Sequence, residues 1–266
     1  MLYVVATPIG NLKDLSFRAV EVLNSVDMIA CEDTRHSLKL LNAYEIKKPL
    51  IAYHKFNERE SGLKIIEELK SGKNIALVSD AGTPLVSDPG SVLTKMLIEE
   101  GLEFTVVPGA CAFVSALILS GMDSSRFCFL GFLPEKQSER REFLSKYANL
   151  DLTLIFYSAP HDIERNVGYL SEAFGNRRAV AVREITKVFE EAVPFNLAEG
   201  YNGEKRGEFV IIVEGASAES ELNDLSPKEH IDYYIANGMD KKEALKKVAK
   251  ERGVSKSELY KYTIED

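Results

Sequence analysis

Residues 75–90 join an apolar run to a loop whose residue types suit ligand binding. Ile75–Val78 is apolar without alternation, which predicts a strand buried on both faces of a parallel sheet. The next stretch, SDAGTPLVSDPG at 79–90, holds two carboxylates, two prolines and two glycines. Glycine permits close backbone approach, proline stiffens a loop, and ligands of open α/β sheets lie at the carboxyl ends of strands. We therefore predict that this loop, with Asp80, is the centre of the functional site.

Asp88 has a second interpretation. It precedes Pro89 and can cap a helix that begins at Pro89 and runs through Leu97. For Asp88 alone we favour this capping role, because Asp before Pro commonly caps a helix. For the segment as a whole we favour a ligand loop, because a plain turn does not need so many special backbone residues.

Polar or small residues follow other predicted strands as well. Glu32, Asp33 and Arg35 follow the strand 27–31 and could orient a polar substrate or cap the next helix, and both roles remain open. His54 ends the strand 50–54, and we keep it as a minor candidate because a lone His is more often structural. The small residues 108–112 open a helix, where they could expose backbone N–H groups to a ligand or allow close packing.

The order of strands and helices predicts an α/β fold with two domains and a small helical module. The N-terminal domain, 1–121, has a parallel sheet, and the C-terminal α/β domain spans 126–216 with strands at 127–133, 153–157, 179–182 and 209–213. Residues 215–225 read as a linker. From 226 to 266 the pattern is helical only, at 226–237, 240–252 and 255–264, and fits a helix-turn-helix module.

The charge of the chain is unevenly distributed. The formal net charge is -8, yet residues 241–261 carry eight Lys or Arg against three Glu. A local basic face can bind phosphate on an acidic protein, because salt screens each patch beyond roughly 8 Å. A solvated helix face explains the same pattern equally well.

Composition excludes several classes of protein. The chain has 266 residues, 45% of them hydrophobic, with no basic leader and no apolar run near the length of about 20 residues that spans a membrane, so we expect a cytoplasmic enzyme. Three cysteines without metal-ligand spacing argue against a disulfide framework and against a metal site. The absence of GxGxxG after the first strand, of GxxxxGK[ST] and of a nucleophile elbow disfavours Rossmann enzymes, P-loop NTPases and serine hydrolases.

The loops next to the predicted strands carry short motifs in a fixed order: TPIGNLKD at 7–14, CEDTR at 31–35, SDAGTPLVSDPG at 79–90, VPGACA at 107–112, GFLP at 131–134, YSAPH at 157–161, REITK at 183–187 and RGEF at 206–209. Taken together, these motifs resemble the small-subunit ribosomal RNA methyltransferase branch of the tetrapyrrole (class III) methylase superfamily. The resemblance implies a tetrapyrrole-methylase-like fold, S-adenosylmethionine between the two domains, a homodimer, and 2′-O-methylation of a decoding-centre cytidine in 16S rRNA of the small ribosomal subunit. The chain departs from the usual pattern at Ala110, Cys111 and Asp162, and the last departure puts a substrate contact there in doubt.

The resemblance also implies roles for particular residues. The expected contacts of the methyl donor are Pro8, Asp80, Ala81, Gly82, Pro108, Ala110, Ala112, Tyr157, Ala159, Thr186 and Gly215. We expect Asp80 or Glu184 to supply a general base and Lys187 to lie near a phosphate, and the residues do not rank the two carboxylates. The expected contacts of the RNA are Glu32, Asp33, Arg35, His54, Arg140, Lys241, Lys242, Lys246 and Lys250.

Two other functions stay open at this point. The chain could be a tetrapyrrole or diphthine-type methylase that acts on a small molecule or a protein, although the basic helical tail argues against this because phosphate binding requires such charge. It could also be a non-enzymatic regulator that binds DNA through its helical module and senses a ligand with its α/β body. The first alternative predicts methylation that is insensitive to salt, and the second predicts no turnover of a methyl donor.

Overall fold

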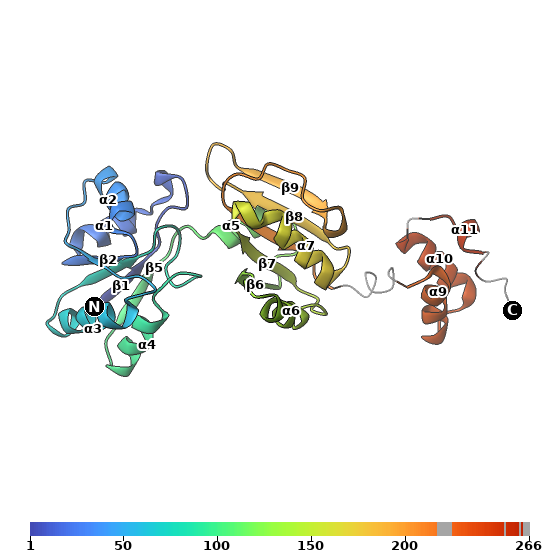
Figure 1. Cartoon of the computed structure of the whole chain (residues 1–266), viewed down its shortest axis with the longest axis horizontal. Helices are drawn as coiled ribbons and strands as arrows, with labels where there is room; N and C mark the ends of the chain where they lie inside the picture. Colours follow the sequence, from blue (N-terminus) through green and yellow to red (C-terminus); the bar gives the residue numbers. More distant parts are fainter. Residues whose placement is uncertain (217–224, 253, 261, 263–266) are drawn as a thin grey trace.

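The computed structural model describes residues 1–216, 225–252, 254–260 and 262. In this part of the chain two five-stranded sheets follow one another, and a group of three helices comes after them (Figure 1). Most of the expected linker 215–225 and the end of the third predicted helix, to residue 264, lie outside the described residues.

The first sheet is entirely parallel, with the strand order β3-β2-β4-β1-β5. Its strands are β1 (Leu2–Val5), β2 (Met28–Cys31), β3 (Leu50–Ala52), β4 (Ile75–Val78) and β5 (Phe104–Val107). Helices α1 (Phe17–Ser25) and α2 (Thr34–Ala43) cover one face, while α3 (Glu58–Lys70) and α4 (Ser91–Glu99) cover the other. All four residues of β4 are buried, as the apolar run 75–78 predicts for a central strand.

Because the strands are parallel, their carboxyl ends share one edge of the sheet, and the loops after neighbouring strands lie side by side. The loops after β1 and β4 touch directly, since Thr7 and Gly82 form an isolated antiparallel bridge and exchange backbone hydrogen bonds of 2.8 and 3.1 Å. Gly82 adopts a φ of 82°, which favours glycine. The sequence motifs 7–14 and 79–90 therefore build one joint surface.

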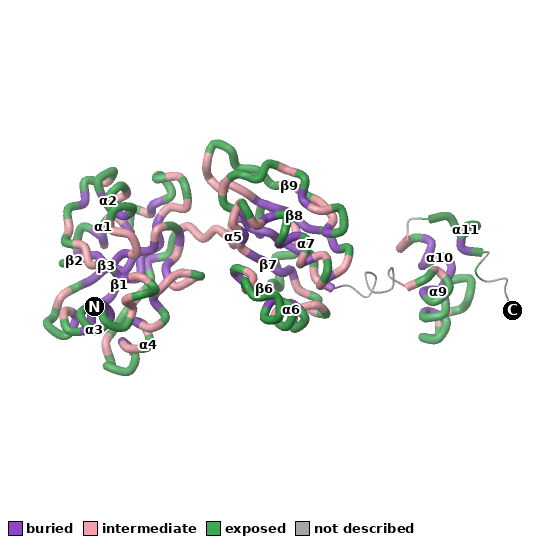
Figure 2. Tube along the Cα trace, in the orientation of Figure 1, coloured by how far each residue is buried: buried purple, intermediate pink, exposed green. Residues whose placement is uncertain are grey.

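The second sheet is mixed, with the order β6-β7-β10-β8-β9. Its strands are β6 (Phe127–Phe132), β7 (Thr153–Ser158), β8 (Arg178–Arg183), β9 (Glu191–Asn196) and β10 (Phe209–Val213), and β10 runs antiparallel to both of its neighbours. The helices α6 (Gln137–Ser145) and α7 (Ile163–Phe174) pack on one face. Figure 2 shows buried strands at the centre of both sheets, whereas the edge strands β6 and β9 are more exposed.

Helix α5 (Ala112–Ser120) precedes the domain boundary that we expected at residue 121, yet it packs on the second sheet. Its buried residues Ala116 and Leu117 pack against Ile155, Val180 and other residues of the second sheet, so α5 belongs to the second domain by packing. The helix is apolar on all sides, and such a helix carries no stripe that indicates which sheet it covers.

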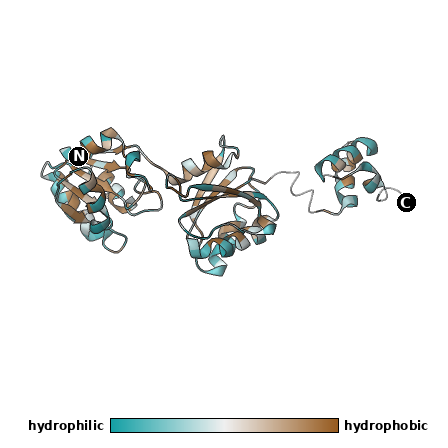
Figure 3. Ribbon diagram, turned by 90° about the horizontal axis from the view of Figure 1, so that it is seen from above, coloured by the Kyte–Doolittle hydropathy of each residue, from teal (hydrophilic) through white to brown (hydrophobic). Residues whose placement is uncertain are grey.

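The three helices after the linker form a separate small core. They are α9 (Pro227–Ala236), α10 (Lys241–Glu251) and α11 (Lys256–Tyr260). Ser226 and Glu229 form a capping box at the start of α9, and the predicted apolar stripe of α10 is confirmed as buried: Ala244, Leu245, Val248 and Ala249. The outer faces of these helices are hydrophilic (Figure 3). Among the described residues no helix is long and apolar enough to cross a membrane.

Candidate functional site

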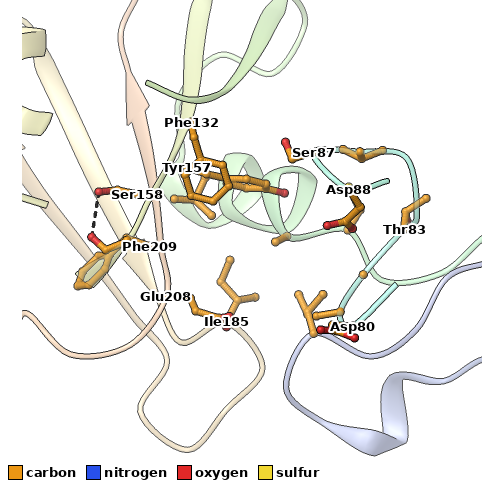
Figure 4. A pocket seen from close by; sticks show the side chains of 18 of the residues that line it. Asp80, Thr83, Ser87, Asp88, Phe132, Tyr157, Ser158, Ile185, Glu208 and Phe209 are labelled. Atoms are coloured by element: carbon orange, nitrogen blue, oxygen red, sulfur yellow. Dashed lines mark hydrogen bonds between the residues drawn. The ribbon is translucent and has the colours of Figure 1, made fainter. Parts of the chain in front are cut away.

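A cavity of about 500 Å³ lies between the carboxyl edge of the first sheet and the second domain. Its lining comes from both domains, and Figure 4 shows the carboxylates of Asp80 and Asp88 facing Ile185 and Tyr157 across the space. The lining residues are Ile9, Glu32, Asp80, Ala81, Gly82, Thr83, Val86, Ser87, Asp88, Cys111, Ala112, Phe132, Tyr157, Ser158, Ala159, Pro160, Ile185, Glu208, Phe209 and Val210. This volume suits a cofactor or a small ligand.

The loop 79–90 forms the wall on the side of the first domain. Leu85 and Ser87 have φ values of 72° and 67°, which non-glycine residues rarely adopt. A Cβ on Gly131 of β6 would lie 3.2 Å from Ser87 Oγ, so the loop reaches the second domain directly. Unusual backbone conformations gather at ligand sites, where the surrounding contacts hold them in place.

Three carboxylates line this wall. Asp80 is oriented by the backbone N–H of Asp33, which donates to its Oδ1 at 3.2 Å. Burial raises the pKa of Glu32, and the charges of Asp80 and Asp88 raise it further. Burial also raises the pKa of Asp88, with a smaller contribution from Asp80. Burial and the neighbouring negative charges make the ionised forms of these carboxylates unfavourable. A cation bound between the carboxylates would stabilise the ionised forms.

The capping role that we favoured for Asp88 is wrong. Helix α4 begins at Ser91, its N-cap is Gly90 with a φ of 138°, and Pro89 is not its first helical residue. A Cβ on Gly90 would come within 2.8 Å of Leu85 Cγ, so the tight end of the loop requires glycine. Asp88 instead lines the cavity.

Neighbouring residues after β2 have separate roles. Asp33 is the N-cap of α2 and accepts the backbone N–H of Arg35 at 2.8 Å. Hydrogen bonds from the backbone and the side chain of Arg35 lower the pKa of Asp33. Glu32 lines the cavity, while the Arg35 side chain is 89% exposed. Of the two roles that the sequence left open, Asp33 caps the helix, while Glu32 faces the cavity, where a substrate role for it stays a prediction.

The second domain contributes an aromatic wall. The rings of Phe132 and Tyr157 meet edge to face with centroids 5.4 Å apart. Burial raises the pKa of Tyr157 well above its ordinary value, so its hydroxyl stays protonated at neutral pH. Phe209 pairs with Ser158 across the sheet, and both line the cavity.

Two loops from different domains meet next to the cavity. Thr186 Oγ1 donates to Asp14 Oδ2 at 2.6 Å, and a Cβ on Gly10 would lie 2.5 Å from Lys187 Cγ. Lys187 Nζ is held by Glu184 Oε1 at 2.9 Å and by Glu208 Oε2 at 2.8 Å. These contacts join the two walls of the cavity at the loops 9–14 and 184–190.

The structure brings many of the expected donor contacts together. Asp80, Ala81, Gly82, Ala112, Tyr157 and Ala159 line the cavity. The other expected contacts of the first domain, Pro8, Pro108 and Ala110, do not line the cavity but belong to the same loops as lining residues; the carbonyl of Ala110 accepts the Thr83 hydroxyl at 3.0 Å. Thr186, Glu184 and Lys187 also lie outside the lining, next to Ile185.

Gly215 does not belong to this group. The cavity lies at Phe209, where β10 begins, whereas Gly215 follows the far end of the strand, about 20 Å away at the usual rise per residue. A Cβ on Gly215 would lie 2.5 Å from the backbone nitrogen of Leu152, so close packing explains the glycine. Gly215 therefore does not line the cavity, and its contact with the donor stays a prediction.

Of the expected RNA contacts, Arg140 is mostly buried and its guanidinium is already engaged within the protein. It is 7% exposed, it donates to the carbonyls of Pro134 and Glu135 at 3.0 and 2.9 Å, and its guanidinium lies 3.5 Å from the ring centroid of Tyr169. The expected lysines of α10 are exposed: Lys241, Lys242, Lys246 and Lys250. His54 is partly buried at the end of β3.

Several lining residues were missed by the sequence analysis as individual contacts. They are Ile9, Thr83, Val86, Ser87, Cys111, Phe132, Ser158, Pro160, Ile185, Glu208, Phe209 and Val210. Most of them fall within the motifs, and Glu208 and Phe209 are in RGEF. Among the described residues, no group of three His, Cys, Asp or Glu is arranged to hold a metal ion.

Comparisons with known proteins agree with this geometry. The sequence profile of the Tetrapyrrole (Corrin/Porphyrin) Methylases matches residues 1–200. The chain is 45% identical to "Ribosomal RNA small subunit methyltransferase I" of Bacillus subtilis (strain 168), over 98% of this chain and 92% of that protein. It is 42% identical to the protein of the same name from Pasteurella multocida (strain Pm70), over 100% of this chain and 97% of that one.

Solved structures show the same fold at low sequence identity. The methyltransferase CobJ superposes with a TM-score of 0.62 at 20% identity, over 81% of this chain and 94% of that chain. Diphthine synthase superposes with a TM-score of 0.59 at 15% identity, over 80% of this chain and 89% of that chain. The chain therefore belongs to the tetrapyrrole (corrin/porphyrin) methylase family, in the group that also contains the relatives named ribosomal RNA small subunit methyltransferase I.

Proposed function

We propose that this chain transfers a methyl group from S-adenosylmethionine to the 2′-hydroxyl of a decoding-centre cytidine in 16S rRNA, acting on the small ribosomal subunit in the cytoplasm. Methylases of this family use S-adenosylmethionine as methyl donor. The observation that carries the proposal is an acidic and aromatic cavity between two domains, in a chain that matches rRNA methyltransferases over nearly its full length.

The residues of the cavity fit this donor. Glu32, Asp80 and Asp88 place negative charge beside a cationic sulfonium, which offsets the cost of burying these carboxylates. Phe132 and Tyr157 offer ring faces and edges to an adenine or to a cation. The donor supplies an activated methyl group, and the protein has to align it with the acceptor oxygen and to exclude water.

Of the two carboxylates that could act as general base, Asp80 is the better placed. It lines the cavity, and the backbone of Asp33 fixes its orientation. Glu184 lies outside the lining, where its Oε1 accepts from Lys187 and from the backbone of Glu208. These bonds and the charge of Lys187 lower the pKa of Glu184 against the opposing effect of burial, which makes it a weaker proton acceptor. We propose that Asp80 takes the ribose proton.

The proposal includes a homodimer. The edge strand β5 leaves Phe104 and Val106 exposed, and α5 leaves Val114 and Ile118 exposed at 40% and 70%. Side chains at i and i+2 of a strand, and at i and i+4 of a helix, share one face. Exposed apolar faces of this kind support burial against a second copy.

The main test measures methylation directly. Small subunits from cells that lack this chain are incubated with the purified protein and labelled donor, and their nucleosides are then identified by mass spectrometry. We expect 2′-O-methylcytidine from a single rRNA position. Asp80→Asn should lower the single-turnover rate about 10²- to 10⁴-fold, while Glu184→Gln, as the matched variant, should lower it much less. No methylated nucleoside with wild-type protein would refute the proposed function.

Salt separates this function from methylation of a small molecule. Each phosphate contact to single-stranded RNA lowers the logarithm of affinity by about 0.7 per tenfold rise in salt. The double variant Lys242→Glu and Lys246→Glu should flatten this dependence for the RNA substrate. The control Lys47→Glu and Lys95→Glu changes two exposed lysines of the first domain and should not. A salt-independent reaction of the wild-type protein would favour a small neutral acceptor.

A further inference from the structure

The turn between β3 and α3, residues 53–57, is built rigidly beside the cavity. Asn57 Oδ1 accepts the backbone N–H of His54 at 2.7 Å, and Asn57 Nδ2 donates to the carbonyl of Ala52 at 3.1 Å. Glu58 Oε1 accepts the backbone N–H of Gly90 at 2.9 Å, which ties the turn to the end of the cavity loop. Since β3 is paired with β2, the turn also lies next to the loop that carries Glu32.

Phe56 belongs to this turn, and its side chain is exposed to solvent. It is 94% exposed, the highest value among the large hydrophobic residues that the structure describes. Among the described residues its ring meets only that of His54, at a centroid distance of 6.2 Å. A single exposed apolar residue is ordinary by itself, so the surroundings decide what Phe56 does.

Cationic side chains lie on both sides of Phe56, and the carboxylates nearby are engaged elsewhere: Glu58 accepts the backbone N–H of Gly90, and Glu60 pairs with Lys64. Lys55 and Arg59 flank it and are exposed, and in the described part of the chain neither has a carboxylate within the 4.0 Å of an ion pair. On the neighbouring helix α2, exposed Lys39 adds to the positive charge, whereas Arg35 is paired with Asp33 at 3.5 Å. A protein partner would be expected to cover a broader apolar surface, whereas an aromatic ring among free cations is typical of single-stranded nucleic acid sites.

We propose that Phe56 stacks on an unpaired base of the RNA substrate near the target nucleotide, while Lys55 and Arg59 contact its backbone phosphates. Sequence-specific RNA recognition uses unstacked bases against aromatic side chains, and the turn offers such a platform at the edge of the cavity. This inference rests on the proposed function, because it assigns the substrate that the same cavity serves.

The test compares three variants in full-length protein with small subunits as substrate. Stacking is worth about 1–3 kcal/mol per base, so Phe56→Ala should raise KM for the subunit about 5- to 150-fold, with the donor Kd unchanged. Phe56→Trp should restore most of the loss, because the indole also stacks. Ile98→Ala removes another exposed apolar side chain, 67% exposed at the far end of α4, and should leave KM unchanged.

The outcomes separate this inference from the proposed function. Wild-type activity on rRNA together with an unchanged KM for Phe56→Ala would overturn the stacking role and leave the function intact. A Phe56→Ala protein with half the molecular mass of the wild type would also overturn it, because Phe56 would then be covered by a second copy. Wild-type protein that methylates no rRNA would overturn both. Lys55→Ala with Arg59→Ala should reduce the salt slope by about 0.7 for each lost phosphate contact.

Discussion

At the scale of single residues, the cavity gathers carboxylates that the sequence distributes over two loops. Glu32 follows β2, whereas Asp80 and Asp88 lie in the loop after β4. The charge of Asp80 raises the pKa of both Glu32 and Asp88, and the charge of Asp88 also raises the pKa of Glu32. The ionised forms of these carboxylates are therefore unfavourable in the free protein, and a bound cation would stabilise them.

Asp88→Asn is expected to stabilise the free protein and to weaken donor binding. Burial raises the folded pKa of Asp88, so above that pKa the ionised group costs folding free energy. Asparagine removes this cost, and we expect the unfolding midpoint at pH 7 to rise by about 1–3 °C, a small value because water partly screens the site. The gain should shrink as the pH falls through the folded pKa, where the wild-type carboxyl takes up a proton.

The measurement pairs calorimetric unfolding scans at pH 7.5 and pH 4.5 with isothermal titration of the donor. Asp232→Asn, which changes an exposed carboxylate on α9, serves as the control and should alter neither quantity. If the Asp88→Asn protein binds the donor as tightly as the wild type, Asp88 does not face the cationic sulfonium of the donor.

Gly10→Ala is expected to disturb the contact between the two domains. The new methyl group would lie 2.5 Å from Lys187 Cγ, and Lys187 has little freedom to move because Glu184 and Glu208 hold its amine. The loops must therefore separate, which should raise the donor Kd several-fold, on the order of 1 kcal/mol or more. Titration calorimetry measures the change. Gly168→Ala, at a glycine of α7 with open space around it and no positive φ, controls for the loss of glycine itself. Equal effects of both variants would contradict the argument.

At the scale of elements, the sequence predicted the first domain better than the second. Buried parallel strands are short apolar runs, and the expected strand 75–78 matches β4 at both ends. Strand β9 was missed because Glu191 and Pro194 interrupt the pattern; β9 is an edge strand, where proline is tolerated. The part of the site on the second domain was harder to predict, because ligands were expected at the carboxyl ends of strands. Antiparallel β10 instead lines the cavity with its first residues.

The helical module contains a buried polar group that makes its stability depend on pH. His230 is fully buried, Arg252 Nε donates to its Nδ1 at 3.0 Å, and its Nε2 lies 3.0 Å from Glu251 Oε2. An Nδ1 that accepts a hydrogen bond requires the neutral ring. Burial, followed by the charge of Arg252, lowers the pKa of His230.

We expect the module to lose stability as the pH falls below about 6.5. In the unfolded chain His230 takes up a proton near that pH, whereas the folded module holds the ring neutral, so acid favours unfolding by at most about 1.4 kcal/mol per pH unit. Hydrogen exchange of the α10 amides between pH 7.5 and 5.5, corrected for intrinsic rates, measures this. His161→Gln, at an exposed histidine of the second domain, should leave the profile unchanged. Equal protection at both pH values would exclude His230 as the cause.

At the scale of the whole molecule, acidic, basic and apolar surfaces lie on different parts of the chain. The cavity is acidic, which suits a cationic donor, while exposed lysines gather on α10 and near the β3–α3 turn. An acidic protein as a whole, at -8, can bind RNA because screening isolates patches from one another. Neither the net charge nor the number of lysines alone indicates where RNA contacts are to be expected.

The exposed apolar face of α5 leads to a prediction about assembly. Ile118 is 70% exposed and shares a helix face with Val114, while the other side of α5 is already buried on the second sheet, so the exposed face needs a different partner. We expect light scattering to give about twice the chain mass of 29.7 kDa. Ile118→Arg should produce a monomer, because a charge in an apolar interface is costly. As a control, Ile98→Arg introduces the same charge at a site of similar exposure, 67%, and this variant should remain dimeric. A monomeric wild type, or a dimeric Ile118→Arg protein, would show that the exposed face of α5 is not part of an interface.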